Sequence, residues 1–329
     1  MKVQSANTYS ANELALLTKV ARLYHEQGVR QPEIAARLSL SQSRVSRLLT
    51  LAQELGIVRI QVVSPEGVHS DLEDGIRERF GLRDVVVAHL EIPGTDATAE
   101  EYATLSAIGA AGANYLQSTL TTGESVGISS WSSTLLAVVD AMANNTAKAS
   151  EIVQLQGGVG NPVAQLQATR LTDYLARLTG ALARFLGAPG VVASREVRDG
   201  LLQDQYISQV VAAWPSLQVA LLGIGAVQPS QLLAQSGNIV TDEEQARLAS
   251  LGAVGDVCLH FYDASGTTVD TSLEERTIGI SGDQLRAVPR RIGFAGGLRK
   301  VEAIRAAAIG GWINVLVTDS VTATALLDN

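Results

Sequence analysis

The chain has 329 residues, of which 46% are hydrophobic and 18% are charged, and its formal net charge at pH 7 is −8. This composition is typical of a packed globular protein and excludes a low-complexity or intrinsically disordered chain. Cys258 is the only cysteine, so an intrachain disulfide and a thiolate metal cluster are excluded, and we expect it to be a buried spectator.

The first residues, MKVQSANTYS, contain no apolar core of the kind that a secretory signal needs. No apolar run approaches the roughly 18 residues of a membrane helix. The four histidines lack the spacing of metal ligands. We therefore expect a cytoplasmic protein with no membrane partner, no metal site and no cofactor.

The charge is distributed unevenly along the chain. Residues 1–63 hold eight Lys or Arg against four acids, a balance of +4, and the remainder carries −12. A Pro, Gly and Ser containing stretch, residues 64–70, separates these parts and is typical of a linker. The sequence predicts a basic DNA-binding domain (1–63), a linker (64–70) and an acidic body (71–329), because a basic head on an acidic body is expected when only the head meets a polyanion.

Three helices are predicted in the basic domain. Ser10 and Glu13 form a capping box that starts the first helix, and Gly28 ends it. Pro32 is favourable at the first position of the second helix, and Ser41 is a good N-cap for the third. Residues 55–63 alternate like a strand and predict a small wing, with Arg59 facing outward.

The second and third helices match the helix-turn-helix pattern, with Ser39 at the turn position that is often Gly. Polar side chains at the N-terminal end of the second helix of this motif can reach base edges in the major groove. The alternatives are a small helical bundle with a solvated polar face, or a protein-docking module of the same shape. We assign base contacts to Gln42, Ser43 and Arg44 and phosphate contacts mainly to Ser41, Ser46 and Arg47.

The body alternates strand-like and helical stretches, which predicts a doubly wound, Rossmann-like α/β domain with a mostly parallel sheet. The predicted strands are 84–90, 124–130, 150–158, 217–226, 290–297 and 314–320, and the predicted helices are 98–117, 132–145, 171–187 and 300–311. Ligands in such folds bind beyond the carboxyl ends of the strands. The turns that follow the strands are therefore the places to look for a site.

The turn with most polar residues lies in GISSWSSTLLAVVD, residues 127–140, where a strand leads into a helix. Exposed amides at a helix start, together with several hydroxyls, can hold an anion or a polyol. The turn lacks the GxGxxG and Walker patterns, which disfavours nicotinamide cofactors and nucleoside triphosphates. A run of N-capping serines with a packed Trp is the alternative. The candidate residues are Gly127, Ser129, Ser130, Trp131, Ser132, Ser133 and Thr134.

Lys300 is the second notable candidate, because the chain has only four lysines against 21 arginines. It follows a Gly-Gly turn at the start of a helix, where an ammonium could meet a phosphate held by backbone amides. Further strand ends offer polar or glycine residues, and with Lys300 they describe a site for a sugar phosphate. These are Gln156, Gly157 and Gly158, then Gly223 and Gly225, then Gly255 and Asp256.

Seven segments, taken in order, resemble the SorC/DeoR family of bacterial sugar-binding transcriptional regulators along nearly the whole chain. They are VRQPEIAARLSLSQSRVSRLL, VGISSWSSTL, IVQLQGGVG, LLGIGA, VGDVCLHFYDASGTTVD, IGFAGGLRKVEAI and VLVTDSVTATALL. The resemblance implies an effector domain similar to sugar-phosphate isomerases and glucosamine-phosphate deaminases, and assembly into dimers or tetramers. It places Ser132, Ser133, Thr134 and Lys300 around a phosphate, and the QGG turn, Gln167 and Asp256 near sugar hydroxyls. The loop Ser-Ser-Trp-Ser-Ser-Thr has fewer glycines than many relatives have.

We therefore predict a DNA-binding transcriptional regulator whose operator binding is modulated by a sugar or polyol. We expect this effector to be phosphorylated. Its partners would be double-stranded operator DNA, the effector and further copies of the chain. The alternative is a sugar-phosphate isomerase or deaminase with an appended DNA-binding head. Such an enzyme needs a placed acid or base, and the sequence nominates no compact His, Asp and Glu constellation, so no catalytic residue is predicted.

Overall fold

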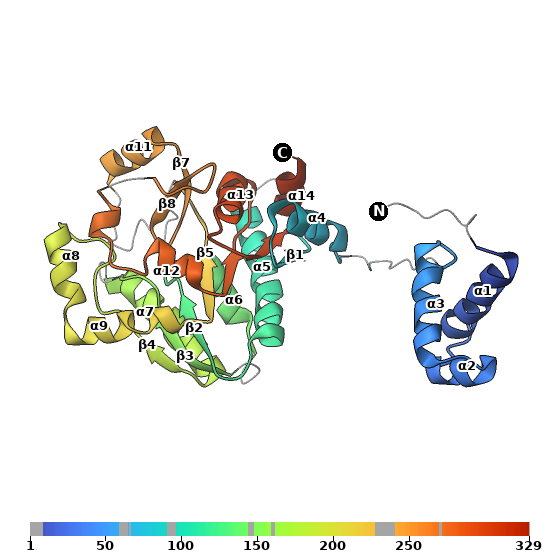
Figure 1. Cartoon of the computed structure of the whole chain (residues 1–329). Coiled ribbons are helices and arrows are strands. Elements are labelled where there is room, and N and C mark those ends of the chain that lie inside the picture. The colour runs from blue at the N-terminus through green and yellow to red at the C-terminus, as the bar shows by residue number, and fades with distance from the viewer. Residues whose placement is uncertain are drawn as a thin grey trace. The chain divides into compact units, whose positions relative to one another are not determined.

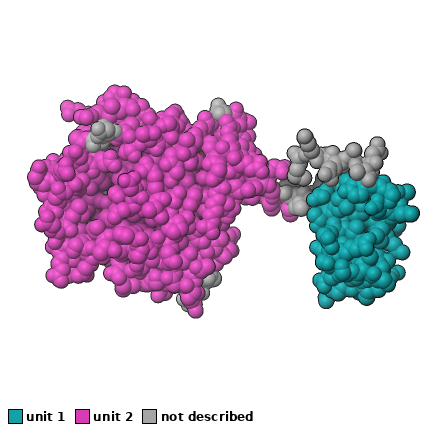
Figure 2. All heavy atoms as spheres, viewed as in Figure 1, with its two compact units in different colours: residues 1–64 teal, residues 65–329 magenta. Residues whose placement is uncertain are grey.

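The computed structural model describes residues 9–58, 65, 67–90, 97–143, 148–158, 162–227, 241–269 and 272–328. The chain forms two compact units, residues 1–64 and residues 65–329, which Figure 2 shows in different colours. Within the described residues, no helix is both long enough and apolar enough to cross a membrane.

The first unit contains the helices α1 (Ala11–His25), α2 (Gln31–Leu38) and α3 (Gln42–Glu54) (Figure 1). The predicted capping box is confirmed, since Ser10 accepts from the Glu13 amide and the Glu13 side chain accepts from the Ser10 amide. Helix α2 starts one residue before Pro32, which is therefore at its second position. The predicted wing depends on residues 59–63, which lie outside the described residues.

One small apolar core holds the three helices together. It contains buried residues from each helix: Val20, Leu23, Ile34, Ala35, Val45 and Leu49. The turn between α2 and α3 contains Ser39, whose φ of 54° and ψ of 41° are left-handed. A glycine adopts this conformation at lower cost, so the serine at this position carries backbone strain.

The second unit is built on a seven-stranded parallel sheet in the order β1-β10-β9-β5-β2-β3-β4. Its strands are β1 (Asp84–Ala88), β2 (Glu124–Ile128), β3 (Ala149–Gln154), β4 (Leu182–Arg184), β5 (Val219–Gly223), β9 (Arg290–Phe294) and β10 (Val315–Asp319). Six of these were predicted from apolar runs, and the doubly wound fold class is confirmed.

Helices cover both faces of this sheet. The described helices of the second unit are α4 (Ser70–Phe80), α5 (Ala97–Thr119), α6 (Ser133–Ala141), α7 (Pro162–Thr179), α8 (Arg195–Leu202), α9 (Gln205–Val211), α11 (Asp242–Ser250), α12 (Gly282–Ala287), α13 (Val301–Ile309) and α14 (Ser320–Asp328), with the short 3-10 helices η2 (Trp214–Ser216), η3 (Glu274–Arg276) and η4 (Leu298–Lys300). Val219 and Leu221 of β5 share a core with α5, α6 and α7, whereas Ala220 and Leu222 share another with α9, α13 and α14. Alternate residues of a strand thus pack under opposite helix layers, as a buried sheet requires.

The structure corrects two sequence predictions. The predicted helix 171–187 is the end of α7 followed by strand β4, because Gly180 (φ 69°) ends the helix and the next residues pair with β3. Asp256 does not follow a strand of the main sheet. It lies within β7 (Ala253–Val257) of a small antiparallel sheet, between β6 (Gly225–Ala226) and β8 (His260–Asp263).

Candidate functional site

The exposed face of α3 carries all six residues that the sequence assigned to DNA contacts. Ser41, Gln42, Ser43, Arg44, Ser46 and Arg47 are exposed. Val45 and Leu49 on the opposite face are buried in the core of the unit, which fixes the direction in which the polar face points. The Ser41 hydroxyl also caps the helix by accepting from the Arg44 amide at 3.3 Å. It also lies 3.1 Å from the Ser43 hydroxyl, and either of these two oxygens can be the donor.

The two arginines of this face, Arg44 and Arg47, have no acidic partner among the described residues. Arg47 Nε donates to the Ser43 carbonyl at 3.3 Å, and no carboxylate of a described residue forms an ion pair with Arg44 or Arg47. By contrast, Arg22 on α1 is paired with Glu26 at 2.8 Å. Exposed and unpaired guanidinium groups at the start of a helix are suited to phosphate oxygens and to guanine edges.

A polar pocket lies in the second unit, beyond the carboxyl ends of β2, β3 and β5. This is the edge of a parallel sheet where ligands are expected. The η4 turn and the β7–β8 hairpin complete the wall. The lining residues are Ser129, Trp131, Ser132, Ser133, Gln156, Gly223, Ile224, Gly225, Ala226, Asp256, Cys258, Leu259, Arg299 and Lys300.

The start of α6 forms the hydroxyl-rich side of the pocket. Ser132 is the N-cap, and its hydroxyl accepts from the Leu135 amide at 3.1 Å. The amides of Ser133 and Thr134 donate to no partner among the described residues. Free amides at the positive end of a helix dipole attract an anion.

Lys300 and Arg299 supply positive charge from the η4 turn. Lys300 is half-buried, and burial lowers the pKa of its ammonium while nearby Asp256 acts in the opposite direction. Arg299 is exposed. The turn that precedes them requires a glycine, because Gly297 has a φ of 93°. An anion would relieve the desolvation of the ammonium by supplying a counter-charge.

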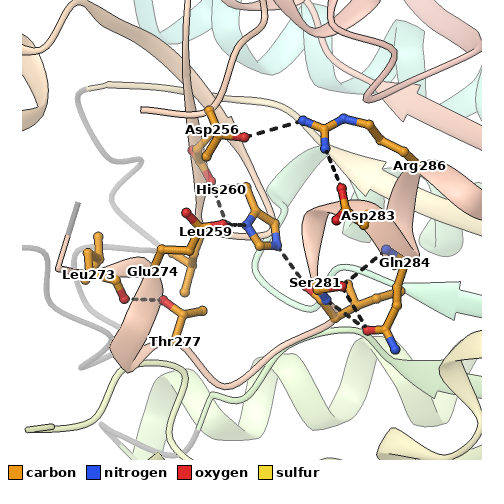
Figure 3. A network of polar contacts seen from close by, with 12 residues as sticks. Asp256, Leu259, His260, Leu273, Glu274, Thr277, Ser281, Asp283, Gln284 and Arg286 are labelled. Atoms are coloured by element: carbon orange, nitrogen blue, oxygen red, sulfur yellow. Dashed lines mark hydrogen bonds and ion pairs between the residues drawn. The ribbon is translucent and has the colours of Figure 1, made fainter. Parts of the chain in front are cut away.

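Asp256 is the acidic group of the pocket. It is buried on the β7–β8 hairpin, and Oδ2 accepts from the Leu259 amide at 3.2 Å (Figure 3). Burial raises the pKa of this carboxyl to about 6, and the Leu259 amide, Lys300 and His260 partly oppose the rise. A Cβ atom at Gly225 would lie 2.0 Å from Oδ1, so the carboxylate fits only because residue 225 has no side chain.

Gln156 presents an unsatisfied acceptor to the pocket. The residue is 3% exposed, and among the described residues its Oε1 atom has no hydrogen-bond partner. A buried acceptor without a donor costs free energy unless a ligand supplies one. A sugar hydroxyl has the donor that this atom lacks.

Trp131 forms an apolar wall beside Gln156. Its Nε1 donates to the Gly157 carbonyl at 3.3 Å, and its ring covers Gly158, where a Cβ atom would lie 2.2 Å from the ring. The two glycines thus hold the indole in place. An indole face suits the C–H groups of a sugar.

Several predicted residues lie next to the pocket without lining it. Gly127 packs inside β2 against Leu155 and Leu217, while Ser130 and Thr134 are buried. The Ser130 hydroxyl has no hydrogen-bond partner among the described residues. The side chain of Gln167 lies outside the part of the chain that the structure describes.

Sequence reasoning missed five lining residues: Ile224, Ala226, Cys258, Leu259 and Arg299. Cys258 is buried as expected, but its thiol lies at the pocket wall, and burial raises its pKa to about 12. Cys258 and Leu259 have φ values of 53° and 67°. Left-handed turns of this kind normally use Asn or Gly. The residues Cys258 and Leu259 therefore gave no sequence signal for a turn at this place.

Comparison with known proteins extends across both units. The Sugar-bind family model, described as a sugar-binding domain, matches residues 50–328. The chain is 32% identical over 315 residues to the deoxyribonucleoside regulator of Bacillus subtilis (strain 168), covering 95% of this chain and 97% of that protein. It is 32% identical over 323 residues to the sorbitol operon regulator of Klebsiella pneumoniae, covering 97% and 99%. The crystal structure of that full-length regulator, SorC, matches with a TM-score of 0.69 at 30% identity over 96% of this chain and 100% of that chain.

Proposed function

The chain belongs to the SorC/DeoR family of sugar-binding transcriptional regulators, and on this basis we propose that residues 1–63 bind operator DNA under the control of a sugar or polyol phosphate bound in the second unit. The two similar regulators are named for sorbitol and for deoxyribonucleosides, both of which are hydroxyl-bearing molecules. Regulation of DNA binding by a sugar is thus the function that the chain supports best.

The single observation that carries the effector class is the chemistry of the pocket. One side offers the Lys300 ammonium and the free amide of Ser133, which suit a phosphate. The other side offers the unpartnered Gln156 oxygen and the Asp256 carboxylate, which accept from hydroxyls. A phosphate joined to a chain or ring of hydroxyls satisfies both sides at once.

For the DNA-binding face, we propose base contacts from Gln42, Ser43 and Arg44 and phosphate contacts from Ser41, Ser46 and Arg47. The support is the joint exposure of these six residues and the lack of acidic partners for the arginines among the described residues. A palindromic operator would require at least two copies of the chain. We propose a dimer or tetramer for this reason.

The regulatory mechanism follows from linkage. An effector shifts DNA affinity only by as much as it binds one arrangement of the assembly better than another. We propose that the chain acts as a sensor without turnover, since its curated relatives are named as regulators. Assays for turnover of glucosamine 6-phosphate and ribose 5-phosphate test this. Product formation above the blank that is lost in Asp256→Asn would establish the enzyme instead.

Fluorescence anisotropy of DNA from upstream of this protein's own gene tests the proposal. Protein is titrated at fixed salt, with and without sugars, polyols and their phosphates. We expect sequence-selective binding that one phosphorylated compound changes at least fivefold, as is usual for allosteric coupling. Lys300→Ala should retain DNA affinity and lose the response, whereas Lys148→Ala, which alters the exposed second lysine of the body, should keep it. Binding that no compound alters would contradict the sensor.

A further inference from the structure

The predicted linker, residues 64–70, ends inside the second unit, where a histidine pair holds it. His69 directly precedes α4, and its Nε2 lies 3.1 Å from Nδ1 of His89, which follows β1. The two rings are stacked, with centroids 5.3 Å apart. Gly67 packs on the same side chain, since a Cβ atom there would lie 3.7 Å from His89 Cγ. The end of the linker is thus held at the carboxyl end of β1.

The carboxyl end of β1 is in turn bonded to the neighbouring strand end. Strands β1 and β10 are paired, with Ala88 opposite Asp319. Beyond this pair, the Leu90 amide donates to the Ser320 hydroxyl at 3.2 Å. Ser320 starts α14, so His89 and Leu90 are held beside the start of that helix.

Asp319 connects the same strand end to the turn that carries Lys300. This carboxylate is fully buried, and Oδ2 accepts from the Gly297 amide at 3.1 Å and from the Thr322 hydroxyl at 2.6 Å. Oδ1 accepts from the Thr322 amide at 2.8 Å. Gly296 lies against the carboxylate, because a Cβ atom there would be 2.2 Å from Oδ2. Only two residues lie between Gly297 and Lys300 along the chain.

We propose that these contacts transmit the effect of effector binding from the Lys300 turn to the linker. In this proposal Asp319 positions the Lys300 turn, and the contact between His69 and His89 changes when the effector binds. The inference rests on the proposed function, because it requires an anion at Lys300. The hydrogen bonds of this connection differ in strength. Charge-assisted bonds to a buried carboxylate resist displacement. The histidine pair lies near the surface, with His69 half-buried and His89 exposed, and the loss of one hydrogen bond limits the coupling to about fivefold.

Hydrogen–deuterium exchange of the full-length protein tests the connection, with inorganic phosphate as the probe and chloride at the same ionic strength as the reference. In the wild type we expect phosphate to slow exchange at residues 131–135 and 298–301. We also expect it to change exchange at Leu90 and at residues 67–73 by up to about fivefold.

Single substitutions show which contact the phosphate effect on exchange depends on. Ser320→Ala should keep the phosphate effect at residues 298–301 and lose it at Leu90 and at residues 67–73. His69→Ala should lose it at residues 67–73 alone, and His69→Gln, whose amide nitrogen can replace Nε2, should restore it. Val68→Ala alters an exposed neighbour outside the connection and should behave as wild type. A purely structural role would change basal exchange without abolishing the phosphate effect.

The outcomes separate the two proposals. No phosphate protection at residues 131–135 or 298–301 in the wild type would refute the anion site and this inference with it. Two other outcomes would refute the connection alone, given phosphate protection at residues 131–135 and 298–301. In the first, phosphate leaves exchange at residues 67–73 of the wild type unchanged. In the second, it changes exchange there equally in the wild type, Ser320→Ala and His69→Ala. Either outcome would leave the effector site standing.

Discussion

Replacement of Asp256 by Asn should stabilise the ligand-free protein at pH 7, because the wild type holds an ionised carboxylate in a buried place. The pKa of Asp256 is raised from its ordinary 3.8 to about 6, chiefly by burial. A raised folded-state pKa means that the unfolded chain releases this proton first as the pH rises. The free energy of unfolding of the wild type therefore falls between about pH 4 and pH 6, and the loss is complete above that window.

The magnitude follows from the size of the shift. A difference of roughly two pKa units at about 1.4 kcal/mol per unit corresponds to about 3 kcal/mol. The Asn variant cannot ionise, and its amide oxygen can still accept from the Leu259 amide. Relative to wild type, its free energy of unfolding should thus rise by up to about 3 kcal/mol from pH 4 to pH 7.

Urea denaturation followed by tryptophan fluorescence measures this difference at each pH. All three tryptophans, Trp131, Trp214 and Trp312, lie in the second unit, so the signal reports on the unit that contains Asp256. Asp140→Asn is the matched control, since that side chain is exposed and forms no ion pair with a described residue. A difference between Asp256→Asn and wild type that stays constant from pH 4 to pH 7 would refute the assigned burial of the charge.

Three further substitutions test other parts of the structure. Arg47→Ala should weaken binding to all DNA sequences and reduce the slope of log affinity against log salt by about 0.9, one phosphate contact; an unchanged slope in anisotropy titrations would remove Arg47 from the interface. Gly225→Ala should displace the Asp256 carboxylate, costing about 1–3 kcal/mol in urea denaturation and abolishing effector binding by calorimetry; full binding would contradict the close approach. Ser39→Gly should stabilise the first unit by about 1 kcal/mol in thermal unfolding followed by circular dichroism, because φ is 54° there. The same change at Ser46, inside α3, should destabilise it by a similar amount.

The main elements were predictable because each carries a local signal. Six strands of the large sheet are apolar runs buried on both faces, and helices of the first unit have recognisable starts, such as the Ser10 and Ser41 caps. The short strands were not predictable. Strand β4 has three residues of no clear preference, and it exists because β3 offers an unpaired edge beyond Gly180. No local pattern encodes the choice of such a partner.

The candidate site was predictable in its chemistry and less so in its membership. Lys300, Ser132, Gln156 and Asp256 were chosen from residue type and position after apolar runs, and the structure brings them to one pocket. The same reasoning also selected Gly127, Ser130 and Thr134, which are buried beside it. Whether a residue of a strand-to-helix turn faces a cavity or the core depends on which neighbours pack against it, and sequence spacing does not contain this.

The sequence alone determined the division into a basic head and an acidic body, the helix-turn-helix pattern, the parallel sheet and the family resemblance. These depend on composition, on period and on short-range caps, which act between residues close in the chain. The tertiary structure alone decided that the β7–β8 hairpin brings Asp256 opposite Lys300 and that Asp319 holds the Gly297 turn. Both depend on contacts between residues far apart in the chain, and only the packing of the sheet and its helices sets these distances.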